Sequence, residues 1–310
     1  MNNFSKVDFY NFFDLKNSPP CLKTESLLDT FNFSYRELTS NELHKVLLEN
    51  LKVIEAGNLN YSGEHRKLQW DKGWNQNLEL IQESPKDLKQ LKPLYYRPNH
   101  IIRLGDKYIY SDSDNFEFNV FQLIRSYLFN NYIEKSACKK LFEFGCGPAH
   151  NLVYFYDCNP KIHYFGLDWA QSSQSIIEVI NKNLNSSITG LQYDFFKPEH
   201  NLPLDQDSIV ITFGALEQTG DQWHKLVSYW IRSKPKLIIN VEPISELYDS
   251  NSLIDHLGLL YHRKRKYLNG FLSFLKNLHD SKLINSLEFK KGCVGGRYMN
   301  GWNIIIMSRG

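Results

Sequence analysis

The segment 141–151 constrains the fold of this chain more than any other. It reads Leu-Phe-Glu-Phe-Gly-Cys-Gly-Pro-Ala-His-Asn, which predicts a short buried strand, a glycine turn and the beginning of a helix. Gly145 and Gly147 let the backbone turn sharply and approach a ligand closely, because they carry no Cβ atom. A strand, a glycine loop and a helix in this order are how doubly wound α/β domains hold a nucleotide-like cofactor.

An acid, Glu143, lies inside the predicted strand. Phosphate groups are bound by backbone N–H groups and by the positive end of a helix, so a carboxylate at this point would repel them. The same carboxylate suits a cofactor that carries a cationic amine or sulfonium. An NAD-type site is the competing interpretation. Glu143 and Pro148 fit it less well, and such a site also uses a third glycine to pack the helix on the strand.

Size, charge and cysteine content exclude several classes of protein. The 310 residues suffice for one large domain or two, and a net charge of +2 gives no electrostatic case for nucleic acid or membrane binding. The five cysteines include no C-x-x-C pair, which argues against a disulfide framework or a zinc knuckle. No signal-peptide pattern opens the chain, and no apolar run approaches the ~20 residues of a membrane span. We therefore expect a cytoplasmic protein.

The chain divides near residue 118. Residues 1–117 form an extension that we expect to be mainly helical and lid-like, with helices within 40–57 and 75–82 and a hairpin at 101–110. Residues 118–310 begin with an amphipathic helix, 118–133, and continue with alternating strands and helices. Such alternation predicts a parallel sheet covered by helices on both faces.

The predicted sheet has seven strands. We expect them at 140–144, 162–167, 188–193, 208–213, 236–241, 286–291 and 302–308, and helices at 151–157, 171–183, 221–232, 246–260 and 267–280. Only a glycine-rich connection joins the last two strands, which makes them an antiparallel hairpin added to the parallel strands.

This order of elements resembles the class I S-adenosylmethionine-dependent methyltransferases over residues 118–310. The resemblance implies a Rossmann-like seven-stranded sheet with an antiparallel last strand, and S-adenosyl-L-methionine as cofactor. In that family an acid precedes a G-x-G-x-G motif. Here Glu143 precedes Gly145 and Gly147, and Ala149 replaces the third glycine. The family's second acid ends strand two and binds both ribose hydroxyls. It corresponds to Asp168, which Trp169 follows.

Two further motifs carry the resemblance. An acid after strand three reads adenine in the family, and Asp194-Phe195 occupies that place. The loop that closes strand four passes under the methionine, and here it begins at Gly214. Each acid also has a structural alternative. Asp168 suits a cap for the helix that begins near Gln171, and Asp194 suits a turn.

Methyl transfer is an in-line displacement, so the enzyme must mainly align the nucleophile with the methyl group. A hydroxyl or a protonated amine also needs a proton acceptor. Glu217 is the first candidate, because it follows strand four directly and the carboxyl edge of such a sheet is where ligands bind. Glu242, after strand five, and His262 are further candidates. The structural alternatives are a helix-start acid for Glu217, a plain turn for Glu242 and an ordinary helix histidine for His262.

Substrate contacts are expected from two regions. The basic run 262–266, with Arg263, suits a clamp for an anionic group, although such a run also suits a solvated face. Trp74 and Tyr96 in the extension suit stacking on a sugar or a base, although core packing is the alternative.

We therefore expect a methyltransferase that acts on oxygen or nitrogen of a small metabolite, such as a sugar or another anionic compound. The alternatives are an RNA methyltransferase and a non-catalytic S-adenosylmethionine-binding regulator. Low net charge and the absence of an Asn/Asp-Pro-Pro-aromatic motif argue against the first, and the acids Glu143, Asp168 and Asp194 argue against the second. No metal is expected, because no group of ligand-type residues follows the strands. The oligomeric state stays open.

Overall fold

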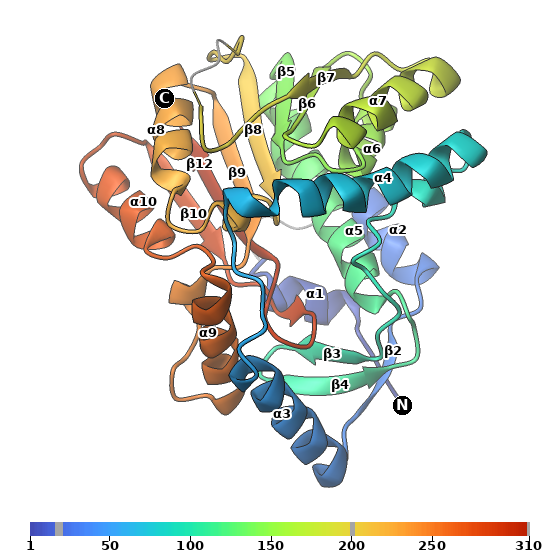
Figure 1. Cartoon of the computed structure of the whole chain (residues 1–310), viewed down its shortest axis with the longest axis vertical. Coiled ribbons are helices and arrows are strands. Elements are labelled where there is room, and N and C mark those ends of the chain that lie inside the picture. Colours follow the sequence, from blue (N-terminus) through green and yellow to red (C-terminus); the bar gives the residue numbers. More distant parts are fainter. Residues whose placement is uncertain (16–20, 199–201, 309–310) are drawn as a thin grey trace.

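The structure is a computed structural model that describes residues 1–15, 21–198 and 202–308. A seven-stranded sheet in the order β10-β12-β9-β8-β5-β6-β7 forms its centre (Figure 1). The strands are β5 (Lys140–Phe144), β6 (His163–Asp168), β7 (Thr189–Gln192), β8 (Ser208–Phe213), β9 (Leu237–Glu242), β10 (Ser286–Lys290) and β12 (Asn303–Ser308). Strands β5 to β9 run parallel, and β12 pairs antiparallel with both β9 and β10. The predicted seven-stranded α/β sheet with an antiparallel last strand is confirmed.

Helices cover both faces of this sheet, because its strands are apolar on both sides. Along β5, Leu141 belongs to one buried apolar cluster, and Phe142 and Phe144 belong to another. The first cluster takes side chains from α5 (Phe116–Leu128), α6 (His150–Cys158) and α7 (Gln171–Leu184), and the second from α8 (Trp223–Ser233) and α10 (Phe271–Asp280). This two-sided burial fixes the carboxyl ends of the parallel strands at one edge.

The extension contains both helices and strands. Its helices are α1 (Lys6–Phe12), α2 (Leu22–Thr30), α3 (Ser40–Glu55) and α4 (Lys67–Glu83). Its strands β1 (Asn2–Asn3), β2 (Ser34–Glu37), β3 (Ile101–Leu104) and β4 (Lys107–Ser111) form a second sheet, which β11 (Val294–Gly295) completes. The predicted hairpin is β3-β4, with Ile101 opposite Tyr110. Because β11 pairs with β3, the second sheet combines strands from both predicted parts of the chain.

Two predicted helices begin at other residues. Helix α4 begins at Lys67 rather than near 75, and Gly73 lies inside it. Helix α9 (Leu253–Arg265) begins after Ser252, whose side chain accepts the N–H of Asp255 as an N-cap, so the predicted beginning at 246 is wrong. The basic run therefore lies mainly in the last turn of α9 rather than between helices. Cations are favourable there, because the carbonyl end of a helix is negative.

Helix α4 crosses the carboxyl edge of the central sheet (Figure 1). Its Asp71 accepts hydrogen bonds from the backbone N–H (3.0 Å) and the hydroxyl (2.8 Å) of Ser172, in the first turn of α7. Ala170 precedes α7 and has no capping side chain, so Asp71 supplies the missing cap from a different part of the chain. This contact fixes α4 above the loops that follow β5 and β6.

Candidate functional site

A cavity of about 660 Å³ lies between α4 and the carboxyl ends of the central strands. Its wall includes Glu143, Gly145, Gly147, Asp168, Trp169, Phe195 and Gly214. The structure therefore brings together all of the predicted cofactor residues except Asp194. We call this space the first cavity.

Glycine is required in the loop after β5 for both conformation and space. Gly145 has φ +76°, and a Cβ atom on it would lie 2.3 Å from the Cβ of Ala215. Gly147 has φ +51°, and its Cβ would lie 2.9 Å from Cζ2 of Trp74. Ala149, which replaces the family's third glycine, also adopts a positive φ of +59°. An alanine in this region costs roughly 1–2 kcal/mol, so the loop keeps the glycine conformation at some expense in stability.

Glu143 presents an incompletely bonded carboxylate to the first cavity. Its side chain is buried, with 1% of the residue exposed. Asn151 donates to Oε1 at 2.7 Å, whereas Oε2 has no hydrogen-bond partner among the described residues. Burial raises the pKa of Glu143 to about 8, although Asn151 and the charge of Arg125 oppose the rise. A buried acid with a free oxygen fits a cationic donor, as an ammonium or sulfonium cofactor would supply.

Asp168 is held in place by backbone groups at the end of β6. Its Oδ2 accepts the N–H of Gly147 at 3.0 Å, and its Oδ1 accepts the N–H of Ala170 at 2.9 Å. Burial raises its pKa to about 6. Each oxygen can accept one more hydrogen bond, which fits a vicinal diol. Asp168 can therefore accept the hydrogen bond from Ala170 and also bind the hydroxyl groups of a ribose.

Aromatic rings form another part of the wall. Trp169 stacks on Phe196 with centroids 5.7 Å apart, and Phe195 lies beside them in the wall. Asp194 is not among the lining residues, and its Oδ1 accepts the N–H of Phe196 at 3.0 Å. The turn alternative for Asp194 is thus what the structure contains, and its contact with adenine stays a prediction.

A second cavity of about 1030 Å³ adjoins the first. The two share Trp70, Tyr95, Gly214 and Gln218 in their walls. The second cavity extends from this junction toward α9 and the segment before β12. The two cavities are therefore neighbours along this shared wall.

Glu217 lies at the wall of the second cavity, in the short helix Leu216–Thr219 that follows β8. Only 7% of the residue is exposed. Gln218 donates to its Oε1 at 2.8 Å, and the guanidinium of Arg66 donates to the amide oxygen of Gln218. Burial and the charge of Glu242 raise the pKa of Glu217 to about 8. An acid that titrates near neutral pH at this point is chemically suited to accept a proton.

Glu242, the second candidate proton acceptor, lies away from both cavities. It is fully buried and lines neither cavity. Its carboxylate accepts the backbone N–H groups of Ala215, Leu216 and Glu217 at 3.1, 3.0 and 3.2 Å. It therefore holds the loop after β8 in position, which the sequence could not distinguish from a carboxylate facing the cleft.

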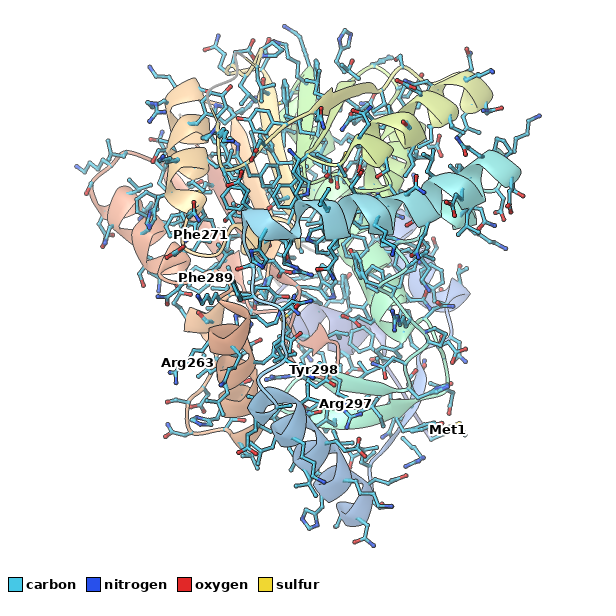
Figure 2. All side chains as sticks on the ribbon, viewed as in Figure 1. Met1, Arg263, Phe271, Phe289, Arg297 and Tyr298 are labelled. Carbon is cyan, nitrogen blue, oxygen red and sulfur yellow. The ribbon has the colours of Figure 1, made fainter. Side chains whose placement is uncertain are left out.

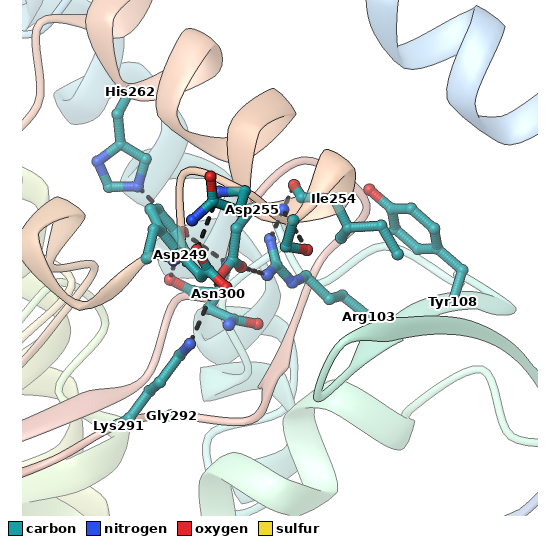
Figure 3. Close-up of polar contacts among 12 residues, drawn as sticks. Arg103, Tyr108, Asp249, Ile254, Asp255, His262, Lys291, Gly292 and Asn300 are labelled. Carbon is teal, nitrogen blue, oxygen red and sulfur yellow. Dashed lines mark hydrogen bonds and ion pairs between the residues drawn. The ribbon is translucent and has the colours of Figure 1, made fainter.

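His262 also lies away from the junction of the two cavities. It is buried, and its Nε2 lies 3.3 Å from the hydroxyl of Tyr248, within the polar cluster around Arg103 and Asp255 (Figure 3). Burial lowers its pKa to about 4, with a contribution from the charge of Arg103. The structure therefore contains the alternative, a buried helix histidine, and a role of His262 as a base stays a prediction.

The remaining predicted contacts lie in different places. Arg263 is exposed on the outer side of α9 and lines a third cavity, which His262 also lines (Figure 2). Arg265, from the same basic run, lines the second cavity. Trp74 packs over Gly147 and lines the first cavity, so it lies on the cofactor side. Tyr96 lines the second cavity and also belongs to the buried apolar core, so its contact with a substrate stays a prediction.

Three polar residues of the site were not singled out in the sequence. Gln218 directly follows Glu217 in the sequence, so the prediction for Glu217 was a signal that could also have identified Gln218. Arg66 and Asp71 lie in the extension, where no motif marks them. Among the described residues, no cluster of His, Cys, Asp and Glu has the grouping of a metal site, and no helix combines the length and apolar character that a membrane span requires.

Comparisons with known proteins find only distant structural similarity. No family model and no curated protein sequence matches the chain. Similar solved structures include magnesium protoporphyrin IX methyltransferase from Synechocystis PCC 6803 with bound SAM, at 12% identity and TM-score 0.44 over 63% of this chain and 82% of that chain. The methyltransferase domain of bacterial CtHen1 has 15% identity and TM-score 0.44 over 62% and 97%. The plantazolicin methyltransferase BpumL, in complex with a monoazolic desmethylPZN analog and SAH, has 10% identity and TM-score 0.45 over 80% of this chain and 99% of that chain. Such values are too low to transfer a function, so the functional argument depends on the residues of the site.

Proposed function

We propose that this chain, whose central sheet has the arrangement of the class I S-adenosylmethionine-dependent methyltransferases, is itself such an enzyme. It would transfer a methyl group to oxygen or nitrogen of a small metabolite, a sugar or another anionic compound, in the cytoplasm. The observation that carries the proposal is the pair of adjoining cavities, with Glu143 and Asp168 in the wall of one and Glu217 in the wall of the other. We propose no membrane, nucleic acid or metal as partner.

The first cavity fits S-adenosylmethionine in its donor set. Glu143 offers a free carboxylate oxygen to a cation, and Asp168 offers two acceptor positions to a diol. Trp169 and Phe195 offer aromatic surface to a purine. When bound, the cofactor would supply a methyl group made electrophilic by its sulfonium.

The residues around the junction perform the remaining tasks. Glu217 takes the proton that an attacking hydroxyl or ammonium must lose, while Gln218 and Arg66 hold its side chain in position. Helix α4 covers one side of the first cavity, with Trp70 and Trp74 in the cavity wall. Alignment and proton removal together are what methyl transfer to oxygen or to a protonated amine requires.

Calorimetry with S-adenosylmethionine and S-adenosylhomocysteine tests the cofactor assignment. We expect both to bind the wild-type protein, and we expect Asp168→Ala to weaken binding by at least about tenfold, because two hydrogen bonds to a charged group are lost. Asp106→Ala is the matched control, since Asp106 is exposed in the β3-β4 turn. Absence of binding by the wild-type protein would refute the proposed function.

A metabolite screen tests the reaction itself. Transfer of labelled methyl groups from S-adenosylmethionine to small sugars, acids and amines is measured with the wild-type protein and with Glu217→Gln. Binding of the cofactor without transfer to any class of acceptor, RNA included, would favour the regulator alternative over the enzyme.

A further inference from the structure

Two arginines in the second cavity have no carboxylate partner among the described residues. Arg66 and Arg265 both line this cavity, and neither takes part in an ion pair, whereas Arg103 and Arg297 are paired with carboxylates. Only 7% of Arg66 is exposed. The Nε of Arg265 is buried and has no hydrogen-bond partner in the described structure. Because buried charges are normally paired, this arrangement lacks an anion.

Neutral groups hold both guanidinium groups in position. Arg66 donates from Nε to the side-chain oxygen of Gln69 at 3.2 Å and lies over the ring of Trp70, 5.1 Å from its centroid. Arg265 lies beside the rings of Tyr261 and Tyr267, at 5.8 and 5.0 Å. These contacts orient the cations without neutralising them, so little side-chain freedom remains to be lost when a ligand binds.

The two cations also lie close enough to repel each other. Burial is the main reason that the pKa of Arg66 is below its usual value, and the charge of Arg265 lowers it further. Glu217 is the carboxylate that opposes this effect, and its own pKa is raised to about 8. Near neutral pH the pair is therefore incompletely compensated. An incoming anion would relieve the repulsion, and its carboxylate or phosphate oxygens match the guanidinium fork.

The rest of the cavity wall is rich in aromatic rings. Tyr261 and Tyr298 stack with centroids 5.1 Å apart, and Tyr96 and Trp302 stack at 6.0 Å. Tyr298 is half-buried, and in the view of Figure 2 it lies between α9 and the strands of the second sheet. Ring faces of this kind favour a flat or ring-shaped body over a flexible polar chain.

We propose that the second cavity binds a small ring compound through an anionic group, a carboxylate or a phosphate, held by Arg66 and Arg265. This inference depends on the proposed function, because it identifies the substrate class of the same site. Arg66 is connected through Gln218 to Glu217, so the anionic group anchors near the proton acceptor. A second oxygen or nitrogen on the ring then faces the junction with the first cavity.

Glu117 limits where the anion can bind. It also lines the second cavity, but its neighbours are Gly296 and Trp302 rather than the two arginines. A carboxylate at that end repels an anion and accepts from a hydroxyl or amine. The cavity therefore has an anion-binding end and an anion-repelling end, which fixes the orientation of the ring compound.

Calorimetry with simple probes tests this site in the full chain, with and without saturating S-adenosylhomocysteine. The probes are benzoate and phenyl phosphate, with benzyl alcohol as the neutral ring, and acetate and inorganic phosphate as anions without a ring. We expect benzoate or phenyl phosphate to bind at least about tenfold more tightly than benzyl alcohol and than the matching ringless anion. Preference for benzoate or for phenyl phosphate identifies the anionic group.

Variants locate the binding site. We expect Arg265→Gln and Arg66→Gln to weaken binding of the acids at least about tenfold, and Arg265→Lys to weaken it less. Lys264→Gln removes the same charge from the same turn of α9 but lies exposed outside the cavity wall, so it should change nothing. Arg265 is only half-buried, which keeps the test valid if Arg66→Gln proves poorly folded by thermal denaturation.

The possible outcomes separate the two proposals. Tight binding of S-adenosylhomocysteine with no binding of either acid at millimolar concentration would overturn the substrate class and leave the methyltransferase proposal standing. Equal binding of benzyl alcohol, or loss of binding in Arg263→Gln instead of Arg265→Gln, would also overturn it. No binding of S-adenosylhomocysteine refutes the proposed function, and the titrations without it still show whether the arginine pair binds acids.

Discussion

Replacing Glu143 with glutamine should stabilise the protein without cofactor and weaken its binding of S-adenosylmethionine. Glutamine has the shape of the protonated acid, which is the form that burial favours in the empty site. The two properties should therefore change in opposite directions. A residue that serves only packing would not produce this combination.

The stability change follows from the pKa of Glu143. An acid whose pKa rises on folding binds more protons in the folded state, so it lowers stability as the pH rises through the interval between the two values. For Glu143 that interval runs from 4.5 to about 8. At pH 7 the cost is about 1.36 × (7 − 4.5), or roughly 3 kcal/mol, and at pH 5 it is below about 1 kcal/mol. Glu143→Gln should recover most of this cost.

The affinity change follows from the free oxygen of the carboxylate. Loss of a charged hydrogen-bond partner for a cationic ligand costs about 1.5–3 kcal/mol, which corresponds to roughly 10- to 150-fold weaker binding. The assay combines urea denaturation of the cofactor-free protein at pH 5 and pH 7 with calorimetry of cofactor binding at pH 7.

Glu178→Gln on the exposed side of α7 is the control, and it should change neither property. Lower stability of Glu143→Gln at pH 7, or unchanged cofactor affinity, would refute the reasoning. The first result would mean that Glu143 contributes favourably to folding, and the second that it faces no cation.

Three further predictions test neighbouring parts of the site. Glu217→Gln should reduce turnover at least about tenfold with little change in cofactor affinity, and it should abolish the rise of wild-type activity with pH around a midpoint near 8; an unchanged pH profile would exclude Glu217 as the base. Gly145→Ala should abolish cofactor binding or folding, because its Cβ would lie 2.3 Å from that of Ala215. Gly270→Ala has a similar φ of +71° but nothing within 4 Å of its Cβ, so it should lower the free energy of unfolding by only about 1–2 kcal/mol in thermal denaturation. Similar losses in both variants would mean that the 2.3 Å clash is unimportant. Asp71→Ala should destabilise the protein by about 1–2 kcal/mol in urea because α7 loses its cap, and Asp71→Asn should retain part of that stability; an Asp71→Ala protein as stable as the wild type would contradict the role of this contact.

Local patterns in the sequence were sufficient for the parallel sheet and for much of the first cavity. Glu143, Gly145 and Asp168 lie at the ends of short apolar runs, and consecutive parallel strands must bring such ends to one edge. The seven predicted strands overlap the observed ones for the same reason. Short-range signals specify the central strands because β5, β8, β9 and β12 are buried almost throughout.

Contacts between distant segments were not predictable from such patterns. The capping of α7 by Asp71 joins two helices of different parts of the chain, and β11 pairs with β3 across the same division. From the sequence, Glu242 is expected in the cleft because it ends a strand. In the structure its carboxylate instead accepts hydrogen bonds from backbone N–H groups of the loop after β8. The position of a carboxylate along a strand does not reveal which donors surround it.

The basic run shows the same limitation more sharply. In the sequence, Arg263 and Arg265 are equivalent members of one cluster, but they lie on different sides of the end of α9. Only the fold decides which of them faces the interior and meets Arg66. A charge cluster in a sequence therefore predicts a kind of ligand better than it predicts the residue that binds it.

The two cavities differ in the charge that they can accept, and this difference orients the proposed reaction. In the first cavity Glu143 has a carboxylate oxygen without a hydrogen-bond partner, whereas in the second cavity, which Glu117 and Glu217 also line, Arg66 and Arg265 have no ion-pair partner among the described residues. A cationic cofactor beside the two arginines would meet like charges, and so would an anionic substrate beside Glu143. Each ligand is thereby directed to its own cavity, and the boundary between the two charge preferences lies at Gly214 and Gln218, where the cavities join. In the proposed reaction the reacting atoms meet at that boundary, and Glu217 can serve as the proposed proton acceptor only because it lies beside it.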